Sequence, residues 1–320
     1  MRFDNGSHYS ARLRTATVAA FFVSLGLVGS CAGSGDEVPN SKVRVIATTS
    51  ILGDVVSRLG GAGIDLEVMI PRGIDPHDFS PSAQQVAAIS SADLVVANGL
   101  ELEEGLEDVL AQAESEGITV IMVGDEIDPL PSEEEAEHEA EDDHGSFDPH
   151  FWQDPIRMKV AVDVIGLWLV NAGVADAQEF TAAYQEEIDA TYADIVNTLD
   201  RIPSDRRLLV TNHDAFGYFA DRFGFEIIGT IIPGGSTLAE PSSAEIAALV
   251  ETIVANEVPA IFVENIGSVG LADILAAETG TEVEVVQLVS DALGEPGSET
   301  GTYLGMLIYN ASAIAEALGE

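Results

Sequence analysis

The chain has 320 residues, of which 46% are hydrophobic, so it is long enough to bury a large core and to form about two domains. Its 55 acidic and 13 basic side chains give a formal net charge of -42, which disfavours nucleic acid and anionic membrane surfaces as partners and attracts cations. The single cysteine, Cys31, excludes an intramolecular disulfide. An acidic surface also keeps a secreted protein soluble, so the charge by itself does not establish cation binding.

The N-terminus has the pattern of an export signal. Two arginines precede an apolar run, Ala16–Val28, that is shorter than the about 20 residues needed to span a bilayer. The run ends in Val28-Gly29-Ser30-Cys31, which resembles a bacterial lipobox, and this resemblance implies cleavage before Cys31 and lipidation of its thiol. A plain signal peptide with an incidental cysteine is the alternative. We therefore predict a lipoprotein signal peptide over residues 1–30 and a flexible tether over 31–41.

From residue 43 onward, short apolar runs alternate with segments of helical spacing, which predicts an α/β fold with mostly parallel sheets flanked by helices. The first set of predicted strands is Val43–Thr48, Asp93–Ala97 and Thr119–Val123. The second set is Leu208–Thr211, Glu226–Ile231, Ala260–Val263 and Val283–Leu288. Predicted helices among them are Ser82–Ser90, Glu245–Ala255 behind a capping box of Ser242 and Glu245, and about Thr302–Leu318.

The segment between the two strand sets, Pro155–Arg201, has no strand signal and breaks near Asn171-Ala172-Gly173. Its second part, from about Asp176, would form a helix roughly 37 Å long, enough to bridge two lobes. We therefore predict an N-terminal α/β lobe over 42–175, a linker helix over 176–202 and a C-terminal α/β lobe over 203–320. Residues 133–143 contain eight acids, and we expect 132–147 to be a disordered acidic surface loop, which includes His138 and is a weak candidate for metal capture.

Three of the six histidines, His77, His150 and His213, occupy turns in specific contexts. Asp-Pro-His occurs twice, at His77 and His150, while His213 and Asp291 each follow an apolar strand closely. Ligands of open α/β sheets bind outside the carboxyl ends of strands. Three imidazoles and one carboxylate would suit tetrahedral Zn²⁺ at roughly 2.0–2.2 Å. A lone loop histidine is usually an ordinary surface group, and spacing alone does not show that these four residues converge.

Several motifs occur in an order that resembles the substrate-binding proteins of zinc/manganese ABC transporters, a cluster that also contains streptococcal adhesin lipoproteins. The resemblance covers about Val43 to the C-terminus. Its motifs are Asp75–Ser82, Ala92–Glu103, Asp148–Pro155, Thr211–Phe219, Glu240–Ser242, Asp291 and Gly301–Tyr303.

This resemblance implies a class III (cluster A-I) fold, in which two α/β lobes are joined by one long helix and the metal lies between them. It implies that His77 and His150 from the first lobe, and His213 and Asp291 from the second, bind the metal. A histidine at the third position resembles the zinc-type members, whereas manganese-type members have glutamate there, in line with the preference of zinc for imidazole.

The function implied is high-affinity capture of a divalent transition metal, Zn²⁺ or alternatively Mn²⁺, as the transported ligand. The chain would act outside the cytoplasm as a lipid-anchored monomer, delivering the ion to an ABC permease with its ATPase, and would not be an enzyme. Two alternatives stay open. A zinc-dependent hydrolase would need an open metal position and a general base, and a surface adhesin need not exclude metal delivery.

Overall fold

The computed structural model describes residues 42–132, 147–266 and 269–319. The predicted signal peptide, Cys31, the tether and most of the predicted acidic loop lie outside these described residues. Within the described ranges, none of the helices combines the length and the apolar character needed to cross a membrane.

The first sheet contains four parallel strands in the order β2-β1-β3-β4. These are β1 (Val43–Ala47), β2 (Ile64–Val68), β3 (Leu94–Ala97) and β4 (Thr119–Met122). The register pairs Val43 with Ile64, and Leu94 with Thr119. The sequence did not predict β2, because acidic residues interrupt its apolar ones. As an edge strand it has only alternate residues to bury, and the pattern of five residues is too short to distinguish from a loop.

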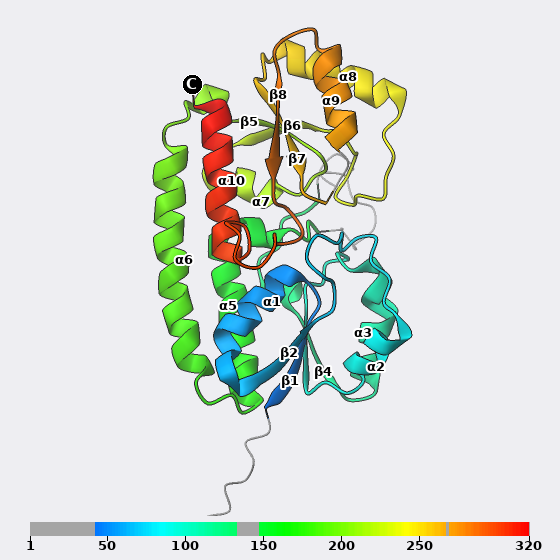
Figure 1. Cartoon of the computed structure of the whole chain (residues 1–320), viewed down its shortest axis with the longest axis vertical. Helices are drawn as coiled ribbons and strands as arrows, with labels where there is room; N and C mark the ends of the chain where they lie inside the picture. Colours follow the sequence, from blue (N-terminus) through cyan, green and yellow to red (C-terminus); the bar gives the residue numbers. More distant parts are fainter. Residues whose placement is uncertain (1–41, 133–146, 267–268, 320) are drawn as a thin grey trace, which may run out of the picture. The chain divides into compact units, whose positions relative to one another are not determined.

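Helices cover both faces of this sheet (Figure 1). Val45 and Ala47 pack toward α1 (Ser50–Gly60) and α5 (Pro155–Asn171), whereas Ile46, Val95 and Ala97 pack toward α2 (Ala83–Ile89) and α3 (Glu107–Ser115). Alternate side chains of one strand therefore enter different apolar clusters, as expected for a parallel sheet buried on both faces.

The second sheet repeats this arrangement with the order β6-β5-β7-β8. Its strands are β5 (Leu208–Thr211), β6 (Glu226–Thr230), β7 (Ala260–Glu264) and β8 (Glu284–Leu288). Its helices are α7 (Gly217–Phe223), α8 (Ser243–Ala255), α9 (Val269–Glu278) and α10 (Tyr303–Leu318). The predicted capping box of α8 is confirmed, because the amide of Glu245 donates to the Ser242 hydroxyl and the amide of Ser242 donates to the Glu245 carboxylate.

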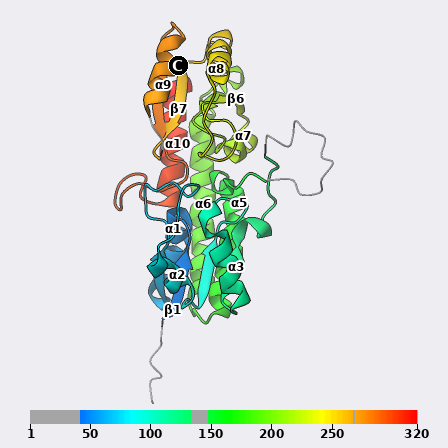
Figure 2. The ribbon, with the colours of Figure 1, turned by 90° about the vertical axis from the view of Figure 1, so that its right-hand side faces the viewer.

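One long helix, α6 (Ala177–Leu199), lies between β4 and β5 in the chain and packs against α1, α5 and α10 (Figures 1 and 2). Its 23 residues span about 35 Å. A single apolar cluster includes residues of both sheets, α5, α6 and α10. The predicted fold class of two α/β lobes with parallel sheets is therefore confirmed. Short 3₁₀ helices complete the described elements at Gly61–Gly63, Glu104–Leu106, Val123–Glu126, Phe151–Gln153 and Ser204–Arg206.

Candidate metal centre

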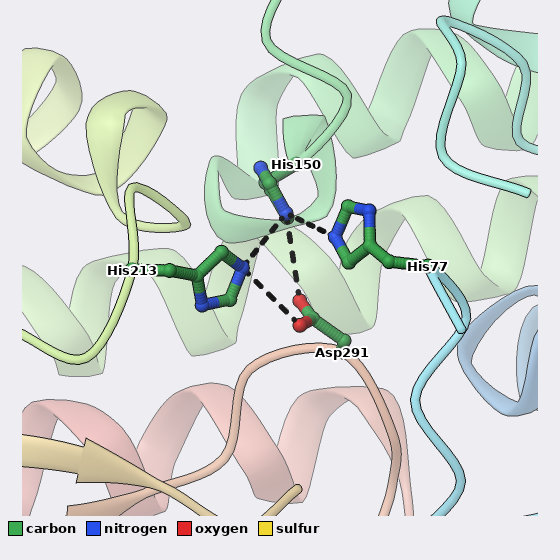
Figure 3. A group of neighbouring side chains, drawn as sticks. All are labelled: His77, His150, His213 and Asp291. Atoms are coloured by element: carbon green, nitrogen blue, oxygen red, sulfur yellow. Dashed lines mark hydrogen bonds and ion pairs between the residues drawn. The ribbon is translucent and has the colours of Figure 1, made fainter. Parts of the chain in front are cut away.

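The structure brings His77, His150, His213 and Asp291 together (Figure 3). His77 lies between β2 and α2, His150 immediately precedes the 3₁₀ helix ahead of α5, and His213 and Asp291 follow β5 and β8. Each residue turns one ligand atom toward a common centre, and these atoms all lie within 4.8 Å of one another. All four residues are at most 4% exposed. Residues far apart in the sequence thus form one buried group.

The separations between the ligand atoms fit a small tetrahedral cation. The Nε2 atom of His150 lies 3.3 Å from Nε2 of His77 and 3.3 Å from Nε2 of His213. Asp291 contributes Oδ2 at 3.4 Å from His213 Nε2 and Oδ1 at 3.7 Å from His150 Nε2. Four ligands bound at about 2.0–2.1 Å in a tetrahedron lie about 3.3–3.4 Å from one another. The separations around His150 and between His213 and Asp291 are therefore close to those around a directly bound ion, and all four ligand atoms lie within 4.8 Å of one another.

Two buried carboxylates set the orientation of the histidine rings. Asp148 Oδ1 lies 2.7 Å from His150 Nδ1 and also accepts the His150 backbone amide at 2.9 Å. Glu264 Oε2 lies 2.7 Å from His213 Nδ1. A carboxylate beside Nδ1 favours the tautomer in which Nδ1 carries the proton and Nε2 offers its lone pair to a metal. The backbone amide of His77 is held in turn by Asp75 Oδ1 at 2.9 Å.

Glu264 is the residue of this centre that the sequence analysis missed. It ends β7, is buried, and accepts hydrogen bonds from the Ser290 hydroxyl at 2.8 Å and from the His213 amide at 3.2 Å. The available signal was a carboxylate directly after the predicted strand Ala260–Val263, at the edge of the sheet where ligands bind. Asp148 begins the Asp-Pro-His motif of His150, but its role also needed the structure.

Burial and mutual repulsion prepare two of the rings for metal binding. Burial, together with the neighbouring histidines, lowers the pKa of His77 to about 2 and that of His150 well below its ordinary value. Burial also opposes a charge on His213, but the carboxylates of Glu264 and Asp291 outweigh it and raise the pKa of His213 to about 10. Burial raises the pKa of Asp291 to about 8. Neutral His77 and His150 thus have free lone pairs at neutral pH, while the adjacent His213 and Asp291 together keep about one to two protons.

The ionised form of Asp291 is disfavoured by burial at this position. Both of its carboxylate oxygens are buried, and they face Nε2 of His213 at 3.4 Å and Nε2 of His150 at 3.7 Å. A buried carboxylate without donors or a cation is strongly disfavoured when ionised. A bound divalent ion would compensate this charge, and the four residues together can hold such an ion.

The family of the chain follows from its sequence profile. The profile of the zinc-uptake complex component A (ZnuA) family of periplasmic proteins matches residues 45–317. The chain belongs to the ZnuA family. The family resemblance expected from the motifs is therefore confirmed.

Similar proteins have names that include both zinc and manganese. Among them, the ZnuA-family chain is 32% identical to the zinc-binding protein TroA of Treponema pallidum (strain Nichols) over 297 residues, which cover 90% of this chain and 92% of TroA. It is 30% identical to the manganese-binding lipoprotein MntA of Bacillus subtilis (strain 168), with 94% and 97% covered. The manganese ABC transporter substrate-binding lipoprotein PsaA of Streptococcus pneumoniae (strain ATCC BAA-334 / TIGR4) is 28% identical, with 96% and 99% covered.

A solved structure agrees with the fold of this ZnuA-family chain. The periplasmic zinc binding protein TroA from Treponema pallidum superposes with a TM-score of 0.78 at 30% identity, covering 87% of this chain and 100% of TroA. Because relatives of similar identity are named for zinc and for manganese, membership of the family does not by itself select the metal.

Proposed function

We propose that the chain captures a divalent transition metal outside the cytoplasm and delivers it to an ABC importer. One observation carries this proposal: four buried side chains, His77, His150, His213 and Asp291, turn their ligand atoms to one point at separations suited to a bare cation. Family membership and the names of the relatives support the same role.

The donor set favours Zn²⁺ over Mn²⁺ as the cargo. Three imidazole nitrogens and one carboxylate match the tetrahedral N/O sites typical of zinc, whereas manganese prefers more oxygen ligands and higher coordination numbers. The decisive position is His213, where a second carboxylate would shift the balance toward manganese.

Delivery defines the other partners. We infer that Cys31 carries a lipid, that residues 31–41 tether the folded part to the outer face of the cell membrane, and that the metal-loaded monomer docks on a permease with its ATPase. The words "lipoprotein" and "ABC transporter substrate-binding" in the names of relatives support this placement. The predicted domain limits, 42–175, 176–202 and 203–320, belong to the same proposal.

The closed surroundings of the site favour binding over catalysis. A catalytic zinc site keeps one position open for water or substrate. Here four protein groups supply a full tetrahedral set and all are buried. An adhesive role can coexist with metal delivery, and growth of a deletion strain under zinc chelation separates the two.

The connection between the sheets favours small movements during binding and release. Beyond the shared apolar cluster, Trp152 Nε1 donates to the Ser290 carbonyl at 2.8 Å, and the Tyr303 hydroxyl donates to the Trp152 carbonyl at 2.8 Å. These bonds tie the segment before α5 to Ser290, next to Asp291, and to the start of α10. We therefore expect the metal-free and metal-bound forms to differ by loop shifts rather than by a wide rotation of one lobe.

A metal competition measured by native mass spectrometry tests the proposal. The wild-type chain, incubated with equal zinc and manganese, should bind one zinc ion. His213→Glu should fold normally and shift the competition toward manganese. A wild-type chain that prefers manganese would overturn the choice of zinc. A chain that binds neither ion, although folded, would overturn the metal-capture role.

A further inference from the structure

Helix α5 is apolar on two opposite sides. One side packs into the core through residues such as Met158, Ile165 and Leu169. The other side carries an apolar surface, here called the α5 face: Val160, Val164, Leu167, Trp168 and Val170. A helix that is apolar all round is normally enclosed by other elements. In the part of the chain that the structure describes, however, four members of the α5 face are 38–61% exposed.

The α5 face follows the period of the helix and forms one stripe. Its members recur at intervals of three and four residues, with Asp163 and Asn171 as the polar positions along it. On one flank, α6 lies beside α5 in both views (Figures 1 and 2), and Lys159 Nζ pairs with Asp189 Oδ1 of α6 at 2.5 Å. Val164 packs at its inner edge against the core cluster, whereas Val160, Leu167, Trp168 and Val170 stay largely exposed.

The position of the α5 face relative to the start of the described chain suggests its partner. Lys42, the first described residue, lines the same surface pocket as Trp168 and Asn171. The upstream segment therefore joins the folded part beside the C-terminal end of α5. A tether of the eleven residues 31–41 reaches at most about 40 Å. A lipid on Cys31 would keep the α5 face within this distance of the membrane.

We propose that the α5 face rests on the neutral lipid surface to which the chain is tethered, with Leu167 and Trp168 in the interfacial layer. This inference rests on the proposed lipidation of Cys31. Tryptophan is favoured at membrane interfaces because its ring is apolar and its N–H is polar. The sequence contains only two lysines; Lys159 is paired with Asp189, whereas the exposed Lys42, beside the C-terminal end of the stripe, can extend its charged group toward lipid phosphates.

A membrane fits the α5 face better than a second copy of the chain. Five side chains, one of them half-buried, do not supply the ~800 Å² per partner typical of a stable protein interface. Two chains with a net charge of -42 also repel each other. A short tether, in contrast, raises the local concentration of the membrane to roughly the millimolar range, so a weak contact is sufficient. The same negative charge predicts that anionic lipids weaken the contact.

Tryptophan fluorescence with brominated lipid tests the proposal directly. The chain has two tryptophans, and Trp152 is 2% exposed, so it serves as an internal reference while Trp168 reports contact with lipid. The lipidated full chain is reconstituted into phosphatidylcholine vesicles with or without bromine on the acyl chains. Bromine should remove up to about half of the emission, since one of the two tryptophans is within reach. Trp168→Phe should abolish this quenching.

A matched pair of variants distinguishes docking through the α5 face from non-specific adsorption of the protein to lipid. Leu167→Asn should reduce the quenching, whereas Ile274→Asn should not, because Ile274 is 58% exposed on α9, near the second sheet. Chains that float with the vesicles but show no quenching would overturn the docking and leave the anchor intact. Failure to float with the vesicles would instead overturn the anchor, and the docking with it. A spectral shift of Trp168 that depends on protein concentration without vesicles would assign the face to a second copy.

Discussion

Replacing Glu264 by glutamine tests how many protons the metal centre releases when it binds an ion. Glutamine keeps the size of the side chain but removes the charge that faces His213 Nδ1 at 2.7 Å. The Ser290 hydroxyl, which donates to the Glu264 carboxylate, can donate to the side-chain amide oxygen of the glutamine instead. The change is therefore electrostatic and local, and the fold should be retained.

The expected magnitude follows from the pKa values of the site. At pH 7 a His213 with a pKa of about 10 holds an extra proton, and the pKa of Asp291, raised by burial to about 8, allows the pair to hold up to one more. Both groups must lose protons to bind an ion, whereas His77 and His150 are already neutral because their pKa values are lowered. We expect about one to two protons released per ion, and an affinity that rises with pH by the same slope above pH 7.

Glu264→Gln removes a main cause that raises the pKa of His213, so it should reduce the number of protons released at pH 7 and flatten the pH dependence. At about pH 9, where protons compete less, the variant should bind zinc about 10–100-fold more weakly because the ring loses the carboxylate that orients it. Isothermal titration calorimetry in two buffers of different ionisation enthalpy measures the proton count directly.

Glu103→Gln is the matched control. Glu103 is also a buried glutamate near the carboxyl end of a strand, but it accepts the amides of Asn98 and Gly99 and contacts none of the four candidate ligands. This variant should keep the wild-type proton count. If Glu264→Gln releases as many protons as the wild type at every pH, the assignment of the extra proton to His213 is wrong.

Three further substitutions test the centre and its surroundings. His77→Ala should weaken zinc binding roughly 100-fold, because losing one of four ligands should remove about a quarter of the binding free energy of a typical zinc site. An unchanged dissociation constant would exclude His77 as a ligand. Asp148→Asn should cost about 10–100-fold in affinity, because His150 loses the carboxylate at its Nδ1, and equal affinity in a competition titration would contradict this. Thr237→Val removes a 2.6 Å hydrogen bond to Asp75 and should speed zinc release about 2- to 10-fold in stopped-flow chelation, whereas an unaltered rate would show that this contact does not restrain the site.

Much of the fold could be predicted because its signals are local. The apolar, β-branched runs of β1, β3 and β5 identify buried parallel strands, and the capping box of α8 depends on residues only three positions apart. The strand β2 was missed because its local signal is weak. At the edge of the sheet it buries only part of its surface, so its sequence shows little beyond alternation, and its pairing with β1 decides its conformation.

Some residues of the candidate site could likewise be recognised from local sequence, and others could not. Asp-Pro-His at His77 and His150, and polar residues just after apolar strands, could be recognised as potential ligands, and the resemblance of the motifs indicated that they act together. Glu264 could not be assigned a role, because its importance depends on the 2.7 Å contact with a histidine that precedes it by two strands in the chain.

By itself, the sequence determined the residue types available for metal binding, the parallel α/β architecture and the length of the connecting helix, since each depends on neighbours within a few turns. Only the tertiary structure decided that three Nε2 atoms and one carboxylate meet at one point, that Asp148 and Glu264 orient two of the rings, and that one apolar side of α5 stays uncovered. These features depend on the packing of segments distant in the chain, and the local pattern of residues does not contain that information.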